Sequence, residues 1–483
     1  MSENKVGAGI LNIITESLYD NPIVVFREYV QNSMDSILKN KENTNEYVIK
    51  IWSSKNDLFF LDNGKGIVRD EFENEMVKIG ASSKKKQKNL GYKGIGRLSG
   101  VPYCKKLVFI NIYDYSSGKA QIYTIDSELY DEIKNDENYS DLSFVELMKK
   151  IGTYQDGVDI RTNAELYTEL QKYENVLKKF NSGFVVFMHD ISMVLENTIK
   201  DESFFEELQW LLPVDFCEEL YDSDKKELFE ELTTEKVEDT IPVRYCNICY
   251  NDEQIFRPIK KAMLRDYVCK SNLKYAVGFH TFKGDKIFID KNNSFSGIRI
   301  YIDNMLLCDE NELIQSLEHY GLLLHTSNGQ LQSVKGIGAM IYITDKVNIS
   351  ANARRTFIEV TDNDSLKFLK MLAEFVNNIY DTRYALSNYV SAKAKYQVGA
   401  ERLQQLKENA LEKLRKLAKE DVELTVDSVE DEDDFSGMSI TEKKKVIKKV
   451  ISNKLDVKLK EYVKGLEEMN LETAYDDFVK WLK

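Results

Sequence analysis

Four polar residues in the segment 23–39 have types and spacing that could serve phosphate chemistry. Glu28, Asn32, Asp35 and Lys39 follow one another at intervals of three or four residues. On an α-helix they project within roughly 60° of one another. The other side of this helix is apolar, so we expect it to pack there and leave the polar stripe facing away. Taken alone, such a stripe is typical of an ordinary solvated face.

A carboxylate followed by a glycine turn is the second candidate. An apolar stretch at 58–61 leads into Asp62, and Gly64 and Gly66 follow it. A surface turn is the alternative, because Asn-Gly turns are common. The functional interpretation is that the glycines leave the backbone bare for a flat ligand, while Asp62 accepts a hydrogen bond from an exocyclic amine such as that of adenine.

A glycine-rich loop is the third candidate. Residues 91–96 have the sequence Gly-Tyr-Lys-Gly-Ile-Gly, and Ser82, Ser83 and three lysines precede them. A glycine-rich turn that enters a helix points free backbone donors at an anion, as a triphosphate requires. The lysine run would also suit a solvated loop. The chain has no G-x-x-x-x-G-K-[ST] motif, so a nucleotide must bind differently from the way it binds a common phosphate loop.

The order and spacing of the three candidates resemble the GHKL superfamily, the ATPases grouped from gyrase, the ninety-kilodalton heat-shock chaperone, histidine kinases and MutL. The family motifs Glu-x-x-x-Asn-x-x-Asp, Asp-x-Gly-x-Gly and Gly-x-x-Gly-x-Gly match residues 28–35, 62–66 and 91–96. The resemblance is strong over residues 11–99. The sequence around these motifs is closest to the heat-shock chaperone branch and to the MORC-like branch.

The resemblance implies a role for each residue that matches a motif. Glu28 would be the general base that deprotonates the attacking water, and Asn32 would offer an oxygen to Mg²⁺. Asp62 would select adenine, and Gly94 and Gly96 would cradle the β- and γ-phosphates. The implied nucleotide-binding set is Asn32, Asp35, Lys39, Asp62, Gly64, Gly66, Ile67, Ser82, Ser83, Gly91, Tyr92, Lys93, Gly94, Ile95, Gly96, Gly183 and Lys335.

A fourth family motif, Gly-Thr before a strand, resembles Gly183-Phe184 here, without the threonine. In the family that hydroxyl supports the adenine-binding aspartate. The resemblance therefore implies that either Ser182 or a water takes its place.

The resemblance also implies a cation from a middle-domain loop that reaches the γ-phosphate. Residues 347–357 resemble that loop, with Arg355 the first candidate and Arg354 the second. Lys335 is a third, because other branches of the family use a lysine. A fixed cation there would stabilise charge in the transition state. The alternative is a surface arginine pair.

Composition narrows the location and the partners. The net charge of −14 argues against a general nucleic-acid coat, because phosphate binding depends on Lys and Arg. Six cysteines in 483 residues do not form a disulfide scaffold. Cys246 and Cys249 lack a second pair for zinc, so we expect them to be structural. No secretory signal or membrane-length apolar run is visible, so we expect a cytoplasmic protein that does not enter a membrane.

We predict an α+β protein. Its first domain would be the Bergerat-type α/β sandwich that the resemblance implies, a mixed sheet covered by helices on one face. We expect strands at 47–52, 58–61, 107–113, 120–125 and 184–188, and a mostly helical tract at 128–179. The predicted parts are 1–215 for ATP binding with a lid at about 80–100, 216–239 as an acidic connector, 240–381 as an α+β transducer-like middle domain, and 382–483 as a helical region.

Together these features predict a slow, Mg²⁺-dependent ATPase that works as a conformational switch and closes as a homodimer on a protein client or effector. The helical C-terminal region would either pair with its own copy or pack back on the middle domain. Three alternatives stay open: an ATP-operated nucleic-acid clamp of the MutL or topoisomerase kind, a nucleotide sensor with negligible turnover, and the ATPase sensor of a bacterial defence or stress system.

Overall fold

The computed structural model describes the chain in fifteen segments. They are 7–12, 21–38, 47–78, 95–135, 139–215, 246–258, 268–273, 276–281, 296–302, 304–336, 338–343, 350–351, 358–360, 362–395 and 400–418. The chain forms two compact units. The first contains residues 1–215 and 243–257, and the second contains residues 216–242 and 258–483.

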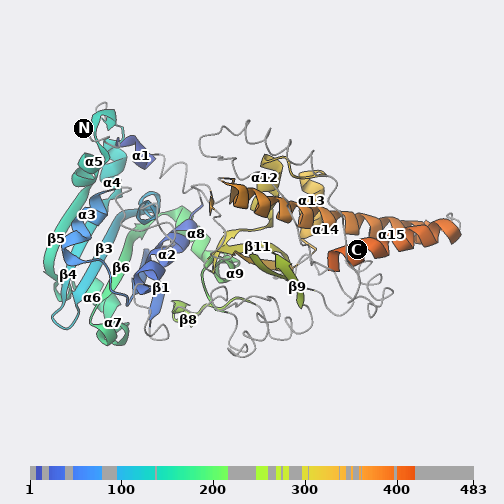
Figure 1. The fold of residues 1–483 in the computed structure, drawn as a ribbon. Coiled ribbons are helices and arrows are strands. Elements are labelled where there is room, and N and C mark those ends of the chain that lie inside the picture. Colours follow the sequence, from blue (N-terminus) through green and yellow to red (C-terminus); the bar gives the residue numbers. More distant parts are fainter. Residues whose placement is uncertain are drawn as a thin grey trace. The chain divides into compact units, whose positions relative to one another are not determined.

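An eight-stranded mixed sheet is the frame of the first unit, with strand order β5-β4-β3-β6-β2-β1-β7-β8 (Figure 1). Neighbouring strands are antiparallel except β1 and β7, which are parallel. The strands are β1 (Val48–Ser54), β2 (Asp57–Asp62), β3 (Cys104–Asp114), β4 (Lys119–Asp126), β5 (Gly152–Asp159), β6 (Gly183–Ile191), β7 (Asn247–Tyr250) and β8 (Glu253–Gln254).

Helices cover both faces of this sheet. Neighbouring residues of a strand point to opposite faces. Phe60 packs against Phe26 and Tyr29 of α2, whereas Phe59 belongs to a core cluster with Leu170 of α6 and Leu177 of α7. The α-helices are α1 (Gly9–Asn12), α2 (Val24–Leu38), α3 (Phe72–Val77), α4 (Ser127–Ile133), α5 (Phe144–Ile151), α6 (Ala164–Gln171), α7 (Glu174–Phe180), α8 (Met193–Lys200) and α9 (Phe204–Leu211).

Short 3₁₀ turns join several of these elements. They are η3 (Arg69–Glu71), η4 (Gly96–Leu98), η5 (Val101–Tyr103), η6 (Tyr139–Asp141) and η7 (Ile160–Thr162).

The predicted α+β class is confirmed, and so are the five predicted strands of the first unit, with longer bounds. The sheet, however, lies between two helical layers and not under one. The tract 128–179 also contains the edge strand β5 among its helices. The hairpin β7–β8 lies within the range predicted for the middle domain, 240–381, but it pairs with β1 of the first sheet. Residues 243–257 therefore belong to the first unit.

The second unit contains a five-stranded sheet with order β12-β11-β13-β10-β9 and a two-stranded sheet of β14 and β15. The strands are β9 (Val268–Leu273), β10 (Ala276–Thr281), β11 (Gly297–Ile302), β12 (Met305–Cys308), β13 (Gly338–Ile343), β14 (Ser350–Ala351) and β15 (Ile358–Glu359). The helices are α12 (Glu310–His319), α13 (Ser327–Val334), α14 (Asn363–Lys395) and α15 (Ala400–Ala418).

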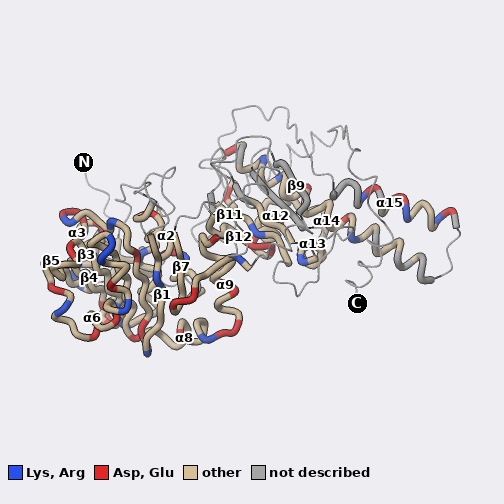
Figure 2. The backbone as a smooth tube through the Cα atoms, turned by 90° about the horizontal axis from the view of Figure 1, so that it is seen from below, with Lys and Arg blue, Asp and Glu red and all other residues tan. Residues whose placement is uncertain are grey.

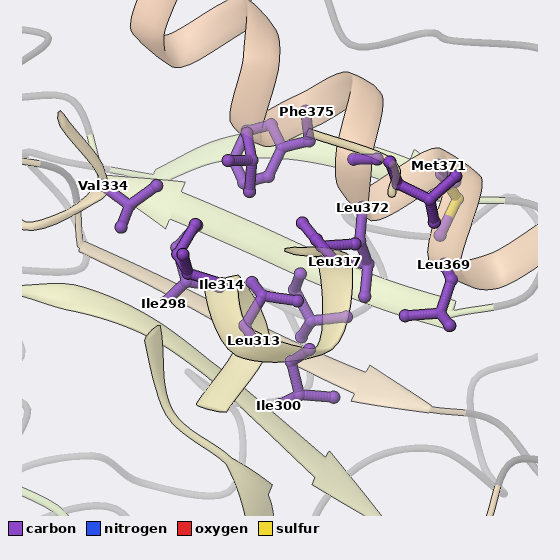
Figure 3. Close-up of a cluster of buried hydrophobic side chains, with 14 of the residues drawn as sticks. Ile298, Ile300, Leu313, Ile314, Leu317, Val334, Leu369, Met371, Leu372 and Phe375 are labelled. Atoms are coloured by element: carbon purple, nitrogen blue, oxygen red, sulfur yellow. The ribbon is translucent and has the colours of Figure 1, made fainter. Parts of the chain in front are cut away.

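One apolar core joins β11, β12, β13 and β15 with the described helices of this unit. Leu313, Ile314 and Leu317 of α12 lie between Ile300 of β11 and Leu372 of α14 (Figure 3). Helix α14 runs unbroken across the predicted boundary between residues 381 and 382. Helix α15 packs back along it, with the Thr382 hydroxyl donating to the Lys413 carbonyl over 3.1 Å. Among the described helices, none is both long and apolar enough to cross a membrane.

Candidate functional site

Helix α2 buries the acidic residues that its sequence pattern singles out. Glu28 is 8% exposed and Asp35 is 2% exposed, so the ordinary solvated face is excluded for this helix. Glu28, Asn32 and Ser36 follow one another at every fourth residue and form one stripe along α2. Asn32 in this stripe is partly exposed. The structure thus brings an acid, an amide and a hydroxyl into one row.

Asp62 ends β2 as a buried carboxylate beside Ser33 and Ser36, near the C-terminal end of α2. It is 1% exposed, and its Oδ1 accepts the backbone N–H of Gly64 over 2.9 Å. Burial raises the pKa of Asp62 to about 7, and hydrogen bonds with Ser33, the Gly64 N–H and Ser36 oppose that rise. A carboxylate in this setting gains from any ligand that donates a further hydrogen bond to it. An exocyclic amine is such a donor.

The turn after Asp62 is held on both sides. Ser36 of α2 accepts the N–H of Gly66 over 3.2 Å, and Asn63 accepts the N–H of Val48 over 2.8 Å. A side chain at residue 64 would not fit, because a β-carbon on Gly64 would lie 2.5 Å from the Ser36 hydroxyl. Gly66 has φ +62°, and a β-carbon there would lie 2.4 Å from the side-chain oxygen of Asn111. Glycine is therefore required twice in this turn.

Ser182, the residue we named as one substitute for the missing threonine, bonds the turn and not Asp62. Its hydroxyl donates to the Gly64 carbonyl over 3.3 Å. Two serines of α2, Ser33 and Ser36, bond the Asp62 carboxylate instead. Gly183 allows β6 to approach β2, because a β-carbon there would lie 2.9 Å from the Asp62 carbonyl.

The Glu28 carboxylate lies against the end of the predicted phosphate loop. A β-carbon on Gly96 would lie 2.1 Å from Oε2 of Glu28. The other oxygen, Oε1, is 3.5 Å from Nε of Arg27. Ile95 precedes the 3₁₀ turn η4 that begins at Gly96. The acid that the resemblance makes a general base is therefore next to the backbone that it makes a phosphate cradle.

Tyr29 fixes the same backbone from the neighbouring position of α2. Its hydroxyl donates to the Arg97 carbonyl over 3.2 Å and accepts the Gly100 N–H over 2.9 Å. Gly100 must stay bare, since a β-carbon would lie 2.3 Å from that hydroxyl. Residues 97–100 are thus attached to α2 one residue away from Glu28.

Several predicted site residues lie outside the described segments. They are Lys39, Ser82, Ser83, Gly91, Tyr92, Lys93, Gly94, Arg354 and Arg355. Lys335 is described, at the C-terminal end of α13 in the second unit. Its carbonyl accepts the Ser296 hydroxyl, and its charge opposes the rise in the pKa of the half-buried Glu310.

The residues present fit a nucleotide with a divalent cation. The amide of Asn32 offers the oxygen type that Mg²⁺ prefers, between the carboxylate of Glu28 and the hydroxyl of Ser36. Among the described residues, no group of three or more His, Cys, Asp or Glu could hold a metal. In nucleotide sites Mg²⁺ typically takes only one or two protein oxygens, and phosphate oxygens and waters complete its coordination. Cys246 and Cys249 are buried free thiols.

Sequence patterns missed the residues that brace the site, namely Ser33, Ser36, Asn111, Gln121 and Tyr29. Ser33 and Ser36 carried a usable signal, because small polar residues inside an otherwise well-packed helix often bond a neighbouring element. The buried amides at 111 and 121 gave no local signal. Their roles depend on which strands become neighbours.

The stripe on α2 has the length of a nucleoside triphosphate. Ser36 bonds the Asp62 turn, Glu28 contacts Gly96, and these two residues are separated by about 12 Å along the helix axis. The base would lie at Asp62 and the phosphates would extend along Asn32 to Glu28. Helix α2 therefore contacts both ends of one extended site.

One family model matches the segment that carries this site. Residues 20–157 match the family described as histidine kinase-, DNA gyrase B- and HSP90-like ATPase. The match includes α2, the Asp62 turn and η4. No curated protein matches the chain.

Proposed function

Because residues 20–157 form an ATP-binding and ATP-hydrolysing domain of the histidine kinase, gyrase and HSP90 type, we propose that the chain is a Mg²⁺-dependent ATPase that works as a conformational switch on a protein partner. One observation carries the proposal: α2 contacts both glycine turns of the site, through Ser36 at Gly66 and through Glu28 at Gly96. A ligand that joins the two turns would act on a single rigid helix.

Adenine binds at the Asp62 end. The carboxylate accepts the exocyclic amine and is kept in place by the Gly64 N–H and two serine hydroxyls. Guanine has a carbonyl where adenine has the amine, so it would present an acceptor to an acceptor. Asp62 is thereby the residue that distinguishes the two purines.

Hydrolysis takes place at the Glu28 end. Glu28 accepts a proton from the water that attacks the γ-phosphate, and its buried position against Gly96 fixes the direction from which that water approaches. Magnesium, held through Asn32, would neutralise phosphate charge. Accepting the proton requires a carboxylate at residue 28. An amide there would leave ATP binding intact and stop ATP hydrolysis.

A protein partner suits the charge of the chain better than a nucleic acid does. The net charge is −14. In α15, three glutamates are interspersed with five lysines and arginines, so the helix carries both signs of charge (Figure 2). We therefore propose a protein client or effector, and a homodimer as the form in which the switch closes.

Sedimentation velocity of Glu28→Gln with Mg²⁺ and ATP tests the dimer, because this variant should retain ATP. We expect monomer without nucleotide and dimer with it. A single unchanged species would contradict the homodimer.

Phosphate release measured with and without duplex DNA distinguishes the protein switch from the nucleic-acid clamp. Strong, salt-sensitive stimulation of phosphate release by DNA would favour the clamp over the protein switch.

A further inference from the structure

Three polar residues and one phenylalanine lie in register in a row across the first sheet. Asp62 of β2 pairs with Phe184 of β6, Phe184 pairs with Asn111 of β3, and Asn111 pairs with Gln121 of β4. Residues that pair directly on neighbouring strands point to the same face. The face that presents the Asp62 carboxylate therefore also presents two side-chain amides. Asn111 is 1% exposed and Gln121 is fully buried.

Asn111 holds both backbone groups of Ile67, the residue after the glycine turn. Its Oδ1 accepts the Ile67 N–H over 3.2 Å, and its Nδ2 donates to the Ile67 carbonyl over 2.8 Å. The same Oδ1 lies where a side chain at Gly66 would begin. The side chain of Asn111 thus takes the place of a neighbouring strand and sets the distance between the turn and the sheet.

Gln121 extends this clamp to the next part of the loop. Its Oε1 accepts the second N–H of Asn111 over 3.1 Å, and its Nε2 donates to the Arg69 carbonyl over 2.9 Å and to the Tyr154 hydroxyl over 2.8 Å. Both N–H donors of each amide are used. The orientation of each amide is therefore fixed, because turning either one would place donor against donor.

We propose that Asn111 and Gln121 are positioning residues for the base-binding part of the nucleotide site. By fixing residues 66–69 against β3 and β4, they determine how far the bare backbone of the turn lies from the Asp62 carboxylate, and so how tightly a purine fits between them. This inference rests on the proposed function. It assigns to the two amides an effect on nucleotide affinity and none on the hydrolysis step at Glu28.

The test compares binding with turnover in Asn111→Leu. Leucine has a similar volume and leaves the Ile67 N–H and carbonyl unpaired. We expect the Kd of ATP, measured by calorimetry with Mg²⁺, to rise about tenfold, while kcat at saturating ATP stays within about twofold. A purely structural role would lower the melting temperature and the active fraction but leave the Kd unchanged, and that result would overturn the proposal.

Asn377→Leu is the matched control. Asn377, in the second unit, is also a buried asparagine that holds a loop backbone, accepting the Leu324 N–H over 3.1 Å and donating to the Leu322 carbonyl over 3.4 Å. It should lower thermal stability without a change in the Kd of ATP. An equal rise in Kd in this control would show that any buried asparagine produces the effect, against the proposal.

Two more variants test whether the hydrogen-bonded chain from Ile67 through Asn111 and Gln121 to Tyr154, here called the relay, acts as one unit. Gln121→Leu combined with Asn111→Leu should raise the Kd little more than Asn111→Leu alone, because both act on one connection. Full additivity would overturn the relay. Tyr154→Phe removes only the outermost acceptor and should raise the Kd slightly in a stably folded protein. Wild-type protein that fails to bind ATP would instead contradict the proposed function.

Discussion

Gly96 lies so close to Glu28 that a single methyl group would displace the carboxylate. The distance from a β-carbon at residue 96 to Oε2 would be 2.1 Å, and to the carboxyl carbon 3.1 Å. The conformation of η4 and the position of the predicted base are therefore linked by contact. Glycine at this position therefore leaves room for the predicted base as well as for the predicted phosphate contacts.

Gly96→Ala should remove hydrolysis. Because Glu28 must move away from the added methyl group, we expect kcat to fall by at least about a hundredfold, the usual contribution of a general base. Phosphate release at saturating ATP measures it. Gly9→Ala is the control, because a β-carbon at Gly9 would meet nothing within 4 Å. A Gly96→Ala enzyme with wild-type kcat would contradict the contact.

The binding of adenosine should depend on pH through Asp62. Its pKa is raised to about 7, so below that pH the free protein carries the protonated acid, which must lose its proton before it can accept the adenine amine. Affinity should therefore fall by up to about tenfold per pH unit as the pH drops below about 7, and level off above it. Adenosine is the ligand of choice for calorimetry, since it has no phosphate to titrate. Equal affinity at about pH 5 and about pH 8 would contradict the assignment.

Asp62→Asn should stabilise the protein at neutral pH while it abolishes ATP binding. The folded-state pKa of Asp62 is raised from 3.8 to about 7. Its favourable contribution is thus fully present below 3.8 and is lost once the pH rises through about 7. Because the asparagine amide carries no charge, the variant avoids this loss, and its free energy of unfolding should exceed that of the wild type by up to about 4 kcal/mol above neutral pH. Denaturant unfolding at about pH 8 and about pH 4 should show the gain only at the higher pH. A gain of equal size at both would point to another cause.

Arg257 should be a major stabiliser of the first unit. It is fully buried, and its guanidinium donates to the carbonyls of Gln209, Trp210 and Leu212 at the end of α9. Arg257→Met would leave these carbonyls without that donor, so we expect a loss of about 3 kcal/mol in denaturant unfolding. ATP affinity should not change.

Arg161→Met is the matched arginine control for that measurement. The Arg161 side chain is 46% exposed and pairs with Asp159 at the surface. Such surface pairs contribute little, so the variant should unfold at nearly the same denaturant concentration as the wild type. A similar loss of stability in both variants would contradict the assignment of Arg257 as a major stabiliser.

Local patterns were sufficient to predict the parts of the site that each lie in one segment. The stripe of Glu28, Asn32 and Asp35 follows from helical periodicity, and Asp62 follows from an apolar strand that ends in a glycine turn. Both elements have strong local preferences. The structure places them as expected, with α2 at Val24–Leu38 and β2 at Asp57–Asp62.

The features of the fold and the site that were not predicted depend on contacts between residues that are distant in sequence. Strand β5 is polar and largely exposed at the sheet edge, so it lacks the apolar alternation of a half-buried strand. Strand β7 pairs with β1 although Ile51 and its partner Tyr250 are far apart in the chain. The roles of Asn111 and Gln121 likewise follow from cross-strand register, which no single segment encodes.

The most direct measurement compares ATP binding and phosphate release in wild type and Glu28→Gln on the same folded preparations. The wild type should bind ATP with Mg²⁺ and release phosphate, whereas Glu28→Gln should bind ATP with similar affinity and release phosphate at least about a hundredfold more slowly. Wild-type protein that shows no heat of binding with Mg²⁺ and ATP, or a Glu28→Gln variant that hydrolyses ATP at the wild-type rate, would contradict the assignment of this site.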